Sequence, residues 1–261
     1  MFGSLGFAGG GRATYFMLDG LRRAGALPRE VAVADPAEKA LARIREAFPD
    51  IGLESEPEAV LDKDLLVLSL HPPALSEFLT GAVGRLKPEA AVLSLAPKVT
   101  LAQLEERLGG ARPIARCIPN APSLVGKGYN PVSFPASLSE PGRTAFLSFL
   151  GPLGEAPQVP ENHLEAYAIL SAMGPTYFWF QFKALRDLGV KFGLPPSDAE
   201  RAVTAMTLGA LDVLWSSGMA PDEVMDLVAF RPLEEVRGQV EGWYEQRLVP
   251  LFHKLRGEAV P

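Results

Sequence analysis

The sequence is poor in cysteine, since Cys117 is the only one among its 261 residues. A single cysteine excludes an intrachain disulfide and leaves no cysteine-rich cluster with the spacing of metal ligands. We therefore expect neither a disulfide framework nor a metal site. A reducing compartment is the simplest environment for such a chain, and a cytoplasmic location is expected.

The sequence also lacks basic blocks and an apolar run long enough to span a membrane. Lysine and arginine number 25 against 31 aspartates and glutamates, a net charge of −6, which argues against a surface that tracks nucleic-acid phosphates. The apolar stretch 166–182 is broken by Gly174 and Pro175, whereas a span needs about 20 apolar residues. Glycines from Gly3 onward interrupt the start, where a secretory signal would be apolar. We expect a small-molecule ligand, with no nucleic acid and no membrane as partner.

What remains is the composition of an ordinary globular protein, with 48% hydrophobic and 21% charged residues. Its length suffices for two domains, each with its own core. In residues 1–158, short apolar runs alternate with helical patterns, which predicts strand–helix units around a parallel sheet. The expected strands are 5–8, 31–34, 65–70, 91–95 and 113–117, with a weaker one at 131–134.

After Pro157 and Pro160 the strand-like runs stop and helical patterns continue. The expected fold is therefore α/β, with an N-terminal Rossmann doubly wound parallel sheet over 1–158 and an all-α C-terminal domain over 159–261. Two capping boxes are predicted. Thr100 with Gln103 would begin a helix that Gly109 ends, and Ser197 with Glu200 would begin a helix that runs to Gly218. Pro221 would lie in the first turn of the next helix.

A glycine-rich loop follows the first expected strand. Gly9 would permit a tight turn, Gly11 would let the backbone approach a pyrophosphate, and the next helix would offer it free N–H groups. The third position of this dinucleotide fingerprint is Thr14 instead of glycine or alanine. The alternative is a flexible turn without a ligand. We predict that NAD or NADP is bound here, by Gly6, Gly9, Gly10, Gly11 and Arg12.

Asp35 ends the second expected strand, where a carboxylate would accept hydrogen bonds from the adenosine ribose of NAD. It could instead cap the helix that starts at Pro36. Arg12 and Lys39 could meet the 2′-phosphate of NADP, so the choice between the two cofactors stays open.

The chain resembles the pyrroline-5-carboxylate reductase family over nearly its whole length. The similar blocks are residues 6–11, Ser69-Leu70-His71-Pro72, Val99-Thr100-Leu101-Ala102-Gln103-Leu104-Glu105, Arg116-Cys117-Ile118-Pro119-Asn120-Ala121-Pro122-Ser123-Leu124-Val125-Gly126, Gly174-Pro175-Thr176-Tyr177 and Gly189-Val190-Lys191-Phe192-Gly193-Leu194-Pro195. The resemblance implies a Rossmann domain, a helical domain that completes the substrate pocket of a second chain, and at least a homodimer. The apolar run Tyr177, Phe178, Trp179, Phe180 and Phe182 fits a helix in such an interface.

The resemblance also implies site residues. Asn120, between two prolines, would orient the nicotinamide ring through its amide, unless the segment is only a proline-bounded loop. Leu70, His71 and Pro72 would lie against the cofactor. His71 stands where the family usually has lysine, and it could contact the cofactor, shuttle a proton or cap the next helix.

The chain departs from the family at the substrate site. The family's G-S-G-P-A-Y is here Ala172-Met173-Gly174-Pro175-Thr176-Tyr177, and its S-P-G-G-T-T loop is Phe230-Arg231-Pro232-Leu233-Glu234-Glu235. Glycine amides and threonine hydroxyls suited to a carboxylate are thus absent. Arg231 could bind the carboxylate instead, or cap the preceding helix at the surface. Lys183, where the family usually carries glutamate, is the second candidate charge.

These features favour an NAD(P)H-dependent reductase of the pyrroline-5-carboxylate reductase type, which transfers a hydride to a small imine or carbonyl. One alternative is a non-catalytic, regulatory NAD(P)-binding homologue that has lost the substrate loop. Another is a dehydrogenase for a different substrate, with Arg231 or Lys183 recruited to the reaction.

Overall fold

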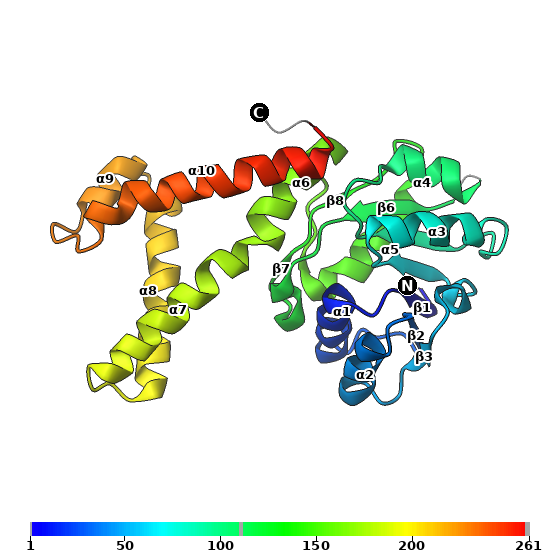
Figure 1. The fold of residues 1–261 in the computed structure, drawn as a ribbon, viewed down its shortest axis with the longest axis horizontal. Coiled ribbons are helices and arrows are strands. Elements are labelled where there is room, and N and C mark those ends of the chain that lie inside the picture. Colours follow the sequence, from blue (N-terminus) through cyan, green and yellow to red (C-terminus); the bar gives the residue numbers. More distant parts are fainter. Residues whose placement is uncertain (1, 110–111, 259–261) are drawn as a thin grey trace. The chain divides into compact units, whose positions relative to one another are not determined.

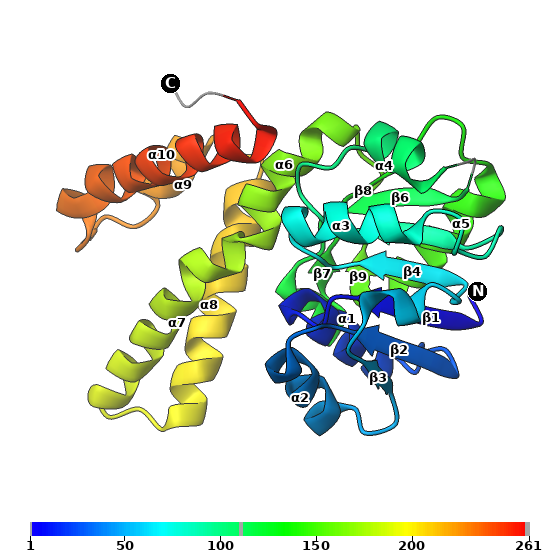
Figure 2. The same cartoon turned by 45° about the vertical axis from the view of Figure 1, so that its right-hand side comes forward.

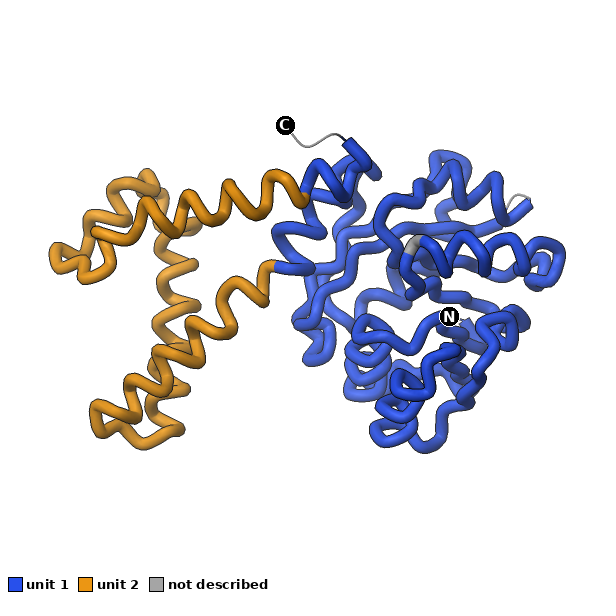
Figure 3. The backbone as a smooth tube through the Cα atoms, viewed as in Figure 1, with its two compact units in different colours: residues 1–173, 252–261 blue, residues 174–251 orange. Residues whose placement is uncertain are grey.

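A computed structural model describes residues 2–109 and 112–258 (Figure 1). The chain forms two compact units, Met1–Met173 with Phe252–Pro261, and Gly174–Leu251 (Figure 3). We call them unit 1 and unit 2.

Unit 1 is built on a seven-stranded sheet with the order β3-β2-β1-β4-β5-β6-β8. Neighbouring strands run parallel except β6 and β8, which are antiparallel. Because the chain winds outward from β1 in both directions, this is a doubly wound Rossmann sheet. The strands are β1 (Ser4–Ala8), β2 (Glu30–Ala34), β3 (Gly52–Glu54), β4 (Leu65–Leu68), β5 (Ala91–Ser94), β6 (Ile114–Cys117) and β8 (Val132–Ser133).

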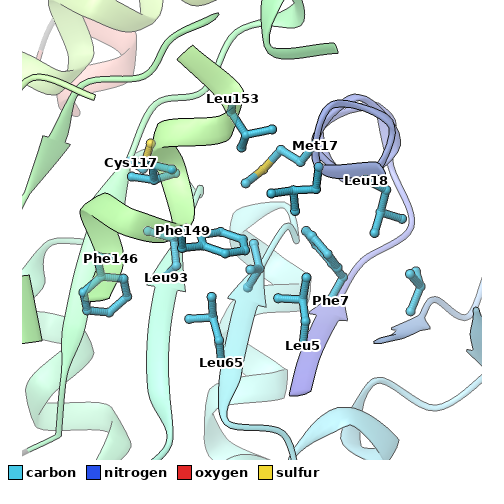
Figure 4. Packing of buried hydrophobic residues seen from close by; sticks show 14 of the residues in the cluster. Leu5, Phe7, Met17, Leu18, Leu65, Leu93, Cys117, Phe146, Phe149 and Leu153 are labelled. Carbon is cyan, nitrogen blue, oxygen red and sulfur yellow. The ribbon is translucent and has the colours of Figure 1, made fainter. Parts of the chain in front are cut away.

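Helices cover both faces of this sheet because its strands are apolar on both sides. In β4, Leu65 and Val67 point to the face covered by α1 (Arg12–Arg23), α2 (Glu38–Ala47) and α5 (Glu140–Leu150). Leu66 and Leu68 point to the opposite face, covered by α3 (Pro72–Ala82) and α4 (Leu101–Leu108) (Figure 2). Figure 4 shows the first layer, in which Met17 and Leu18 of α1 and Phe146 and Phe149 of α5 pack over Leu5, Phe7, Leu65 and Leu93.

The predicted strands are all present, with ends that differ by one or two residues. The sequence reading missed β3 and the short parallel pair β7 (Gly128–Tyr129) and β9 (Gly154–Glu155), which carry little apolar patterning. The Thr100 capping box is confirmed: its hydroxyl accepts the Gln103 N–H, and the Gln103 side chain accepts the Thr100 N–H. Gly109 ends that helix in a left-handed conformation, as predicted.

The predicted Ser197 capping box is wrong. Helix α8 (Pro196–Ser216) begins one residue before Ser197, and Pro195 occupies its N-cap position. Proline at the first helical position loses no hydrogen bond, which lets the helix start earlier than the serine. Helix α9 (Pro221–Asp226) has Pro221 in its first turn, as predicted.

Residues 161–172 are helical, as expected of the second half, yet the segment 159–173 belongs to unit 1. They comprise η4 (Glu161–His163), α6 (Leu164–Tyr167) and a π-helical turn at Ala168–Ala172. Leu164 and Ala168 pack with Ile118 and Leu255 in a small apolar cluster. The division between compact units thus falls at residue 173, fifteen residues after the domain boundary expected at 158, because this segment packs onto the Rossmann fold.

Unit 2 contains α7 (Gly174–Lys191), α8, α9 and most of α10 (Glu234–Arg256). Helices α7 and α8 pack against each other, and Ala199 lies close to Gly189. Many large apolar side chains of unit 2 are exposed in the single chain, among them Phe180 at 66% and Trp215 at 72%. A surface of this kind is typical of a region covered by a partner.

Within residues 2–109 and 112–258, no helix is long and apolar enough to cross a membrane. Over the same ranges, no three histidine, cysteine, aspartate or glutamate side chains are grouped as metal ligands.

Candidate cofactor site and family

The candidate cofactor site lies where the strand order reverses. Strands β1 and β4 are neighbours in the sheet, with Ala8 opposite Leu68. Ligands of open α/β sheets bind beyond the carboxyl ends of the strands at such a reversal. The segments that follow these two strands, 9–11 and 69–71, therefore form the expected binding edge.

Gly9 is required by the backbone itself. Its φ is +104°, and a Cβ there would lie 2.5 Å from the carbonyl oxygen of Ser69. The Gly9 N–H donates to the carbonyl of Ala34, at 2.7 Å. Only glycine permits this conformation so close to another backbone, so Gly9 joins the ends of β1, β2 and β4.

The space beside Gly11 is open, whereas the space beside Gly9 is occupied by neighbouring backbone atoms. A Cβ at Gly11 would meet no atom within 4 Å, and Gly11 is the N-cap of α1 with no side chain bound to the helix end. The first turn of α1 contains no acidic residue. A free helix N-terminus beside an open backbone is a favourable place for a phosphate group. The residues present therefore fit the pyrophosphate of a dinucleotide.

Thr14, the departure from the fingerprint, strengthens the loop. It is fully buried, and its hydroxyl donates to the carbonyl oxygen of Gly9 at 2.6 Å. The hydroxyl thus fixes the loop to the first turn of α1, a contact that glycine or alanine could not make.

Gly6 lies inside β1 and away from the loop. A Cβ there would lie 2.9 Å from Val60, which belongs to the short helix η1 (Pro57–Val60). The small residue lets η1 pack against the strand, while the predicted cofactor contact of Gly6 stays a prediction. Arg12, by contrast, is exposed at the first position of α1, next to the open edge.

Asp35 is held by the backbone. One carboxylate oxygen accepts the Gly10 N–H and the other the Ala37 N–H, both at 2.8 Å. Ala37 is the N-cap residue of α2, so Asp35 ties the glycine loop to the start of that helix. The predicted contact with the ribose stays a prediction, and the capping alternative is not found, because α2 begins at Glu38 and has no side-chain cap. Lys39 is exposed on α2.

The segment after β4 borders the glycine loop. Leu70 is half-buried, and its side chain lies 3.3 Å from the position of a Cβ on Gly9. His71 is exposed at the N-cap of α3, but its side chain makes no capping hydrogen bond. Pro72 is the first residue of α3. The helix-capping alternative for His71 is thus not found, and its predicted contact with the cofactor stays a prediction.

Asn120 is 6% exposed and holds its loop together. Its side-chain oxygen accepts the Tyr129 N–H at 3.0 Å, and its side-chain nitrogen donates to the carbonyl of Ser171 at 3.2 Å. The fully buried Asn130 accepts hydrogen bonds from the Asn120 N–H and from the Ser123 hydroxyl. This network fixes the loop beyond β6, while the predicted role toward the nicotinamide stays a prediction.

Arg116 was missed as a structural element of the site. It is 2% exposed, and it binds Glu161 at 2.6 Å and Glu165 at 2.9 Å. Glu161 also accepts the Leu101 N–H at 2.7 Å. The ion pairs connect β6 to residues 161–165, and the hydrogen bond from Leu101 adds the start of α4. A charged residue inside an otherwise apolar strand was the signal in the sequence.

Arg231 and Lys183 both lie in unit 2, and each is already paired. Arg231 binds the Asp226 carboxylate and donates to the carbonyl of Val228 at 3.3 Å, which places it at the end of α9. Lys183 binds Asp187 one turn further along α7, at 2.5 Å. Both contacts of Arg231 are with residues at the end of α9 or just after it, and the predicted roles of Arg231 and Lys183 at the substrate stay predictions.

Two family models match the chain. One is described as NADP oxidoreductase coenzyme F420-dependent and matches residues 4–98, and one as pyrroline-5-carboxylate reductase dimerisation and matches residues 161–231. The pyrroline-5-carboxylate reductase of Pseudomonas aeruginosa is 32% identical over 221 residues, which are 84% of this chain and 81% of that protein. The chain belongs to the pyrroline-5-carboxylate reductase family. It is thus an NAD(P)-dependent oxidoreductase, as predicted.

Further comparisons with pyrroline-5-carboxylate reductases support the same family assignment. The pyrroline-5-carboxylate reductase of Escherichia coli is 29% identical over 226 residues, 86% of this chain and 84% of that one. Among solved structures, Plasmodium falciparum pyrroline carboxylate reductase with NADP bound has a TM-score of 0.80 at 19% identity, and each chain covers 97% of the other. At that identity the likeness concerns the fold, and it confirms the Rossmann architecture with a helical second part.

The segment 230–235, which the resemblance predicts to be the substrate loop, contains bulky and acidic side chains. Phe230 is 83% exposed, and Glu234 and Glu235 occupy the first turn of α10. Two carboxylates at a helix N-terminus satisfy the positive end of the helix dipole. This helix end is therefore poorly suited to hold an anionic substrate.

Proposed function

We propose that the chain reduces the C=N bond of a small cyclic imine of the pyrroline-5-carboxylate type, with NADPH or NADH as the reductant. The observation that carries the proposal is the open phosphate cradle at Gly11, in a chain 32% identical to a pyrroline-5-carboxylate reductase over 84% of its length. When bound, the dinucleotide supplies the hydride, and the imine nitrogen takes up one proton.

The chain's own residues bind and orient the reactants. The backbone N–H groups at Gly11 and at the start of α1 bind the pyrophosphate. Thr14 and Asp35 hold the glycine loop in its binding conformation before the cofactor arrives, which reduces the entropy lost on binding. His71, exposed beyond β4, is the candidate that passes a proton to the imine nitrogen.

The nicotinamide is expected over the carboxyl ends of β4, β5 and β6, because each half of a Rossmann sheet binds one mononucleotide. Asn120 lies on the loop that follows β6. Its buried hydrogen bonds keep that loop rigid, so the pocket beside the nicotinamide is formed before the substrate binds.

We further propose that the chain works as a homodimer, through unit 2. The dimerisation model covers 161–231, and the aromatic side chains of Phe178, Trp179 and Phe180 on α7 are 44%, 53% and 66% exposed. A second copy would cover this surface. Sedimentation of the intact protein tests this, since a monomer at micromolar concentration would contradict it.

The activity itself is tested with purified protein, NADPH or NADH, and pyrroline-5-carboxylate. Loss of the reduced-nicotinamide absorbance with formation of proline supports the proposal. Tight NADPH binding without turnover of this imine, at any accessible concentration, would contradict it.

A further inference from the structure

The loop between β5 and α4 contains a lysine in an unfavourable backbone conformation. Pro97 and Lys98 form a turn in which Lys98 has a φ of +71°. Proline followed by a residue with positive φ has the features of a type II turn, where glycine or asparagine is preferred. Within the described ranges, Lys98 is the one residue other than glycine with positive φ.

Such a conformation costs stability, and it persists where the side chain is needed. Glycine is used freely for positive φ elsewhere in this chain, for instance at Gly109 and Gly126. A lysine in place of glycine at this turn therefore indicates that its side chain has a function.

The Lys98 ammonium group has no partner in the part of the chain that the structure describes, and the side chain is exposed. It lines a polar cavity of about 240 Å³ in unit 1, together with Thr100, Arg116, Glu161, Glu165 and residues at the end of α10. The other two cations of the cavity wall are neutralised, since Arg116 binds Glu161 and Glu165, and Arg256 binds Glu258.

The carboxylates of this wall are equally occupied. Glu161 and Glu165 share Arg116, and Glu258 contacts both Arg256 and His253. The three carboxylates of the wall equal its three cations in number, so the wall carries no excess charge. Lys98 is the cation of the wall without an ion-pair or hydrogen-bond partner among the described residues, and its N–H donors are available to an anion that enters the cavity.

The position of Lys98 fits the reacting end of the cofactor. It follows β5 by four residues, and β5 is the neighbour of β4 in the half of the sheet expected under the nicotinamide. Glu234 and Glu235, by contrast, make the start of α10 unfavourable for an anion.

We propose that Lys98 binds the carboxylate of the imine substrate and so determines specificity for carboxylated imines; this rests on the proposed reductase function. The ammonium group forms a charge-assisted hydrogen bond with the carboxylate. The turn places the lysine side chain at the cavity, and the positive φ of Lys98 is the strain that this placement requires.

Two imines that differ only in the carboxylate test the assignment, namely pyrroline-5-carboxylate and 1-pyrroline. Steady-state rates are measured with the full chain at saturating NADPH, for the wild type, Lys98→Asn and Lys98→Gly. Asparagine tolerates the positive φ without the charge, and glycine removes the strain as well. The control Lys87→Asn removes an exposed lysine that binds Asp64 at the amino end of the sheet.

Both Lys98 variants are expected to raise KM for pyrroline-5-carboxylate roughly tenfold or more. In both Lys98 variants, KM for 1-pyrroline and Kd for NADPH are expected to stay unchanged. In Lys87→Asn, both KM values and Kd for NADPH are expected to equal those of the wild type. Lys98→Gly is also expected to raise Tm by roughly 2–4 °C, because the backbone strain is relieved. If 1-pyrroline is not turned over, inhibition by proline and by pyrrolidine gives the same comparison.

An unchanged KM for pyrroline-5-carboxylate in Lys98→Asn, in an active enzyme, would overturn the assignment and leave the proposed function intact. Equal rises for both imines would also overturn it, because they indicate a general structural effect. A wild type that binds NADPH and reduces neither imine would refute the proposed function, and the assignment with it.

Discussion

Replacement of Gly11 by aspartate is expected to separate folding from cofactor binding. Gly11 has a φ of −70°, and no atom lies within 4 Å of the position of its Cβ. An aspartate can therefore adopt the native backbone without a clash. It would also become the N-cap of α1, where it gains a few tenths of a kcal/mol over glycine, with about 0.3–1 kcal/mol from the helix dipole.

The same carboxylate occupies the space of the pyrophosphate. Two like charges about 4 Å apart repel by about 4 kcal/mol at the effective dielectric constant of a protein surface. Since about 1.4 kcal/mol corresponds to a factor of ten, affinity for NADPH should fall roughly thousandfold. Gly11→Asn has nearly the same size and also caps the helix, and it should lose much less affinity because it carries no charge.

The assay is titration of each variant with NADPH, followed by nicotinamide fluorescence, beside a thermal melt. The expected result is an equal or higher Tm for Gly11→Asp with binding almost lost, and intermediate binding for Gly11→Asn. An affinity for NADPH equal to that of the wild type would show that no phosphate lies against Gly11, and the cofactor site would have to be placed elsewhere.

Three further outcomes are expected. Asp35→Ala should weaken NADH and NADPH alike, because it releases the Gly10 N–H and loosens the loop; a selective loss of NADH in parallel titrations would instead assign Asp35 to the ribose. Arg116→Met should destabilise the fold by about 3–5 kcal/mol, since Glu165 stays buried without its partner; urea unfolding checks this, and a loss below about 1 kcal/mol would contradict it. The hydrogen bond from Lys87 lowers the pKa of Asp64 in the folded state. This pair therefore stabilises the fold above the usual pKa of aspartate, and the contribution is lost as the pH falls through the lowered value. In Asp64→Asn, Tm should therefore fall less steeply as the pH is lowered below the usual pKa of aspartate. A fall in Tm as steep as that of the wild type would contradict the pairing.

Much of the fold could be predicted from the sequence, because continuous apolar runs mark buried parallel strands. The predicted runs end at Ala8, Ala34 and Leu70, and the strands of the structure end at Ala8, Ala34 and Leu68. Strand β3 escaped prediction because Gly52–Glu54 has a single apolar residue. The segment 159–173 was assigned to the helical domain from its pattern, whereas its place in unit 1 depends on the partners of Arg116.

The position of the cofactor site could be predicted from the sequence, whereas its individual contacts could not. The glycine loop is recognisable because only glycine permits the conformation found at Gly9. The contacts of Asp35 depend on the direction of the Gly10 N–H, which a sequence pattern does not contain. Lys98 escaped because the positive φ of a Pro-Lys turn becomes visible only with the backbone.

The most direct test of the reductase function is NADPH oxidation by the wild-type protein with pyrroline-5-carboxylate, with proline measured as the product. Proline formed in equal amount to the NADPH consumed, and abolished in Gly11→Asp, is the expected result. Saturable NADPH binding with no proline formed would contradict it.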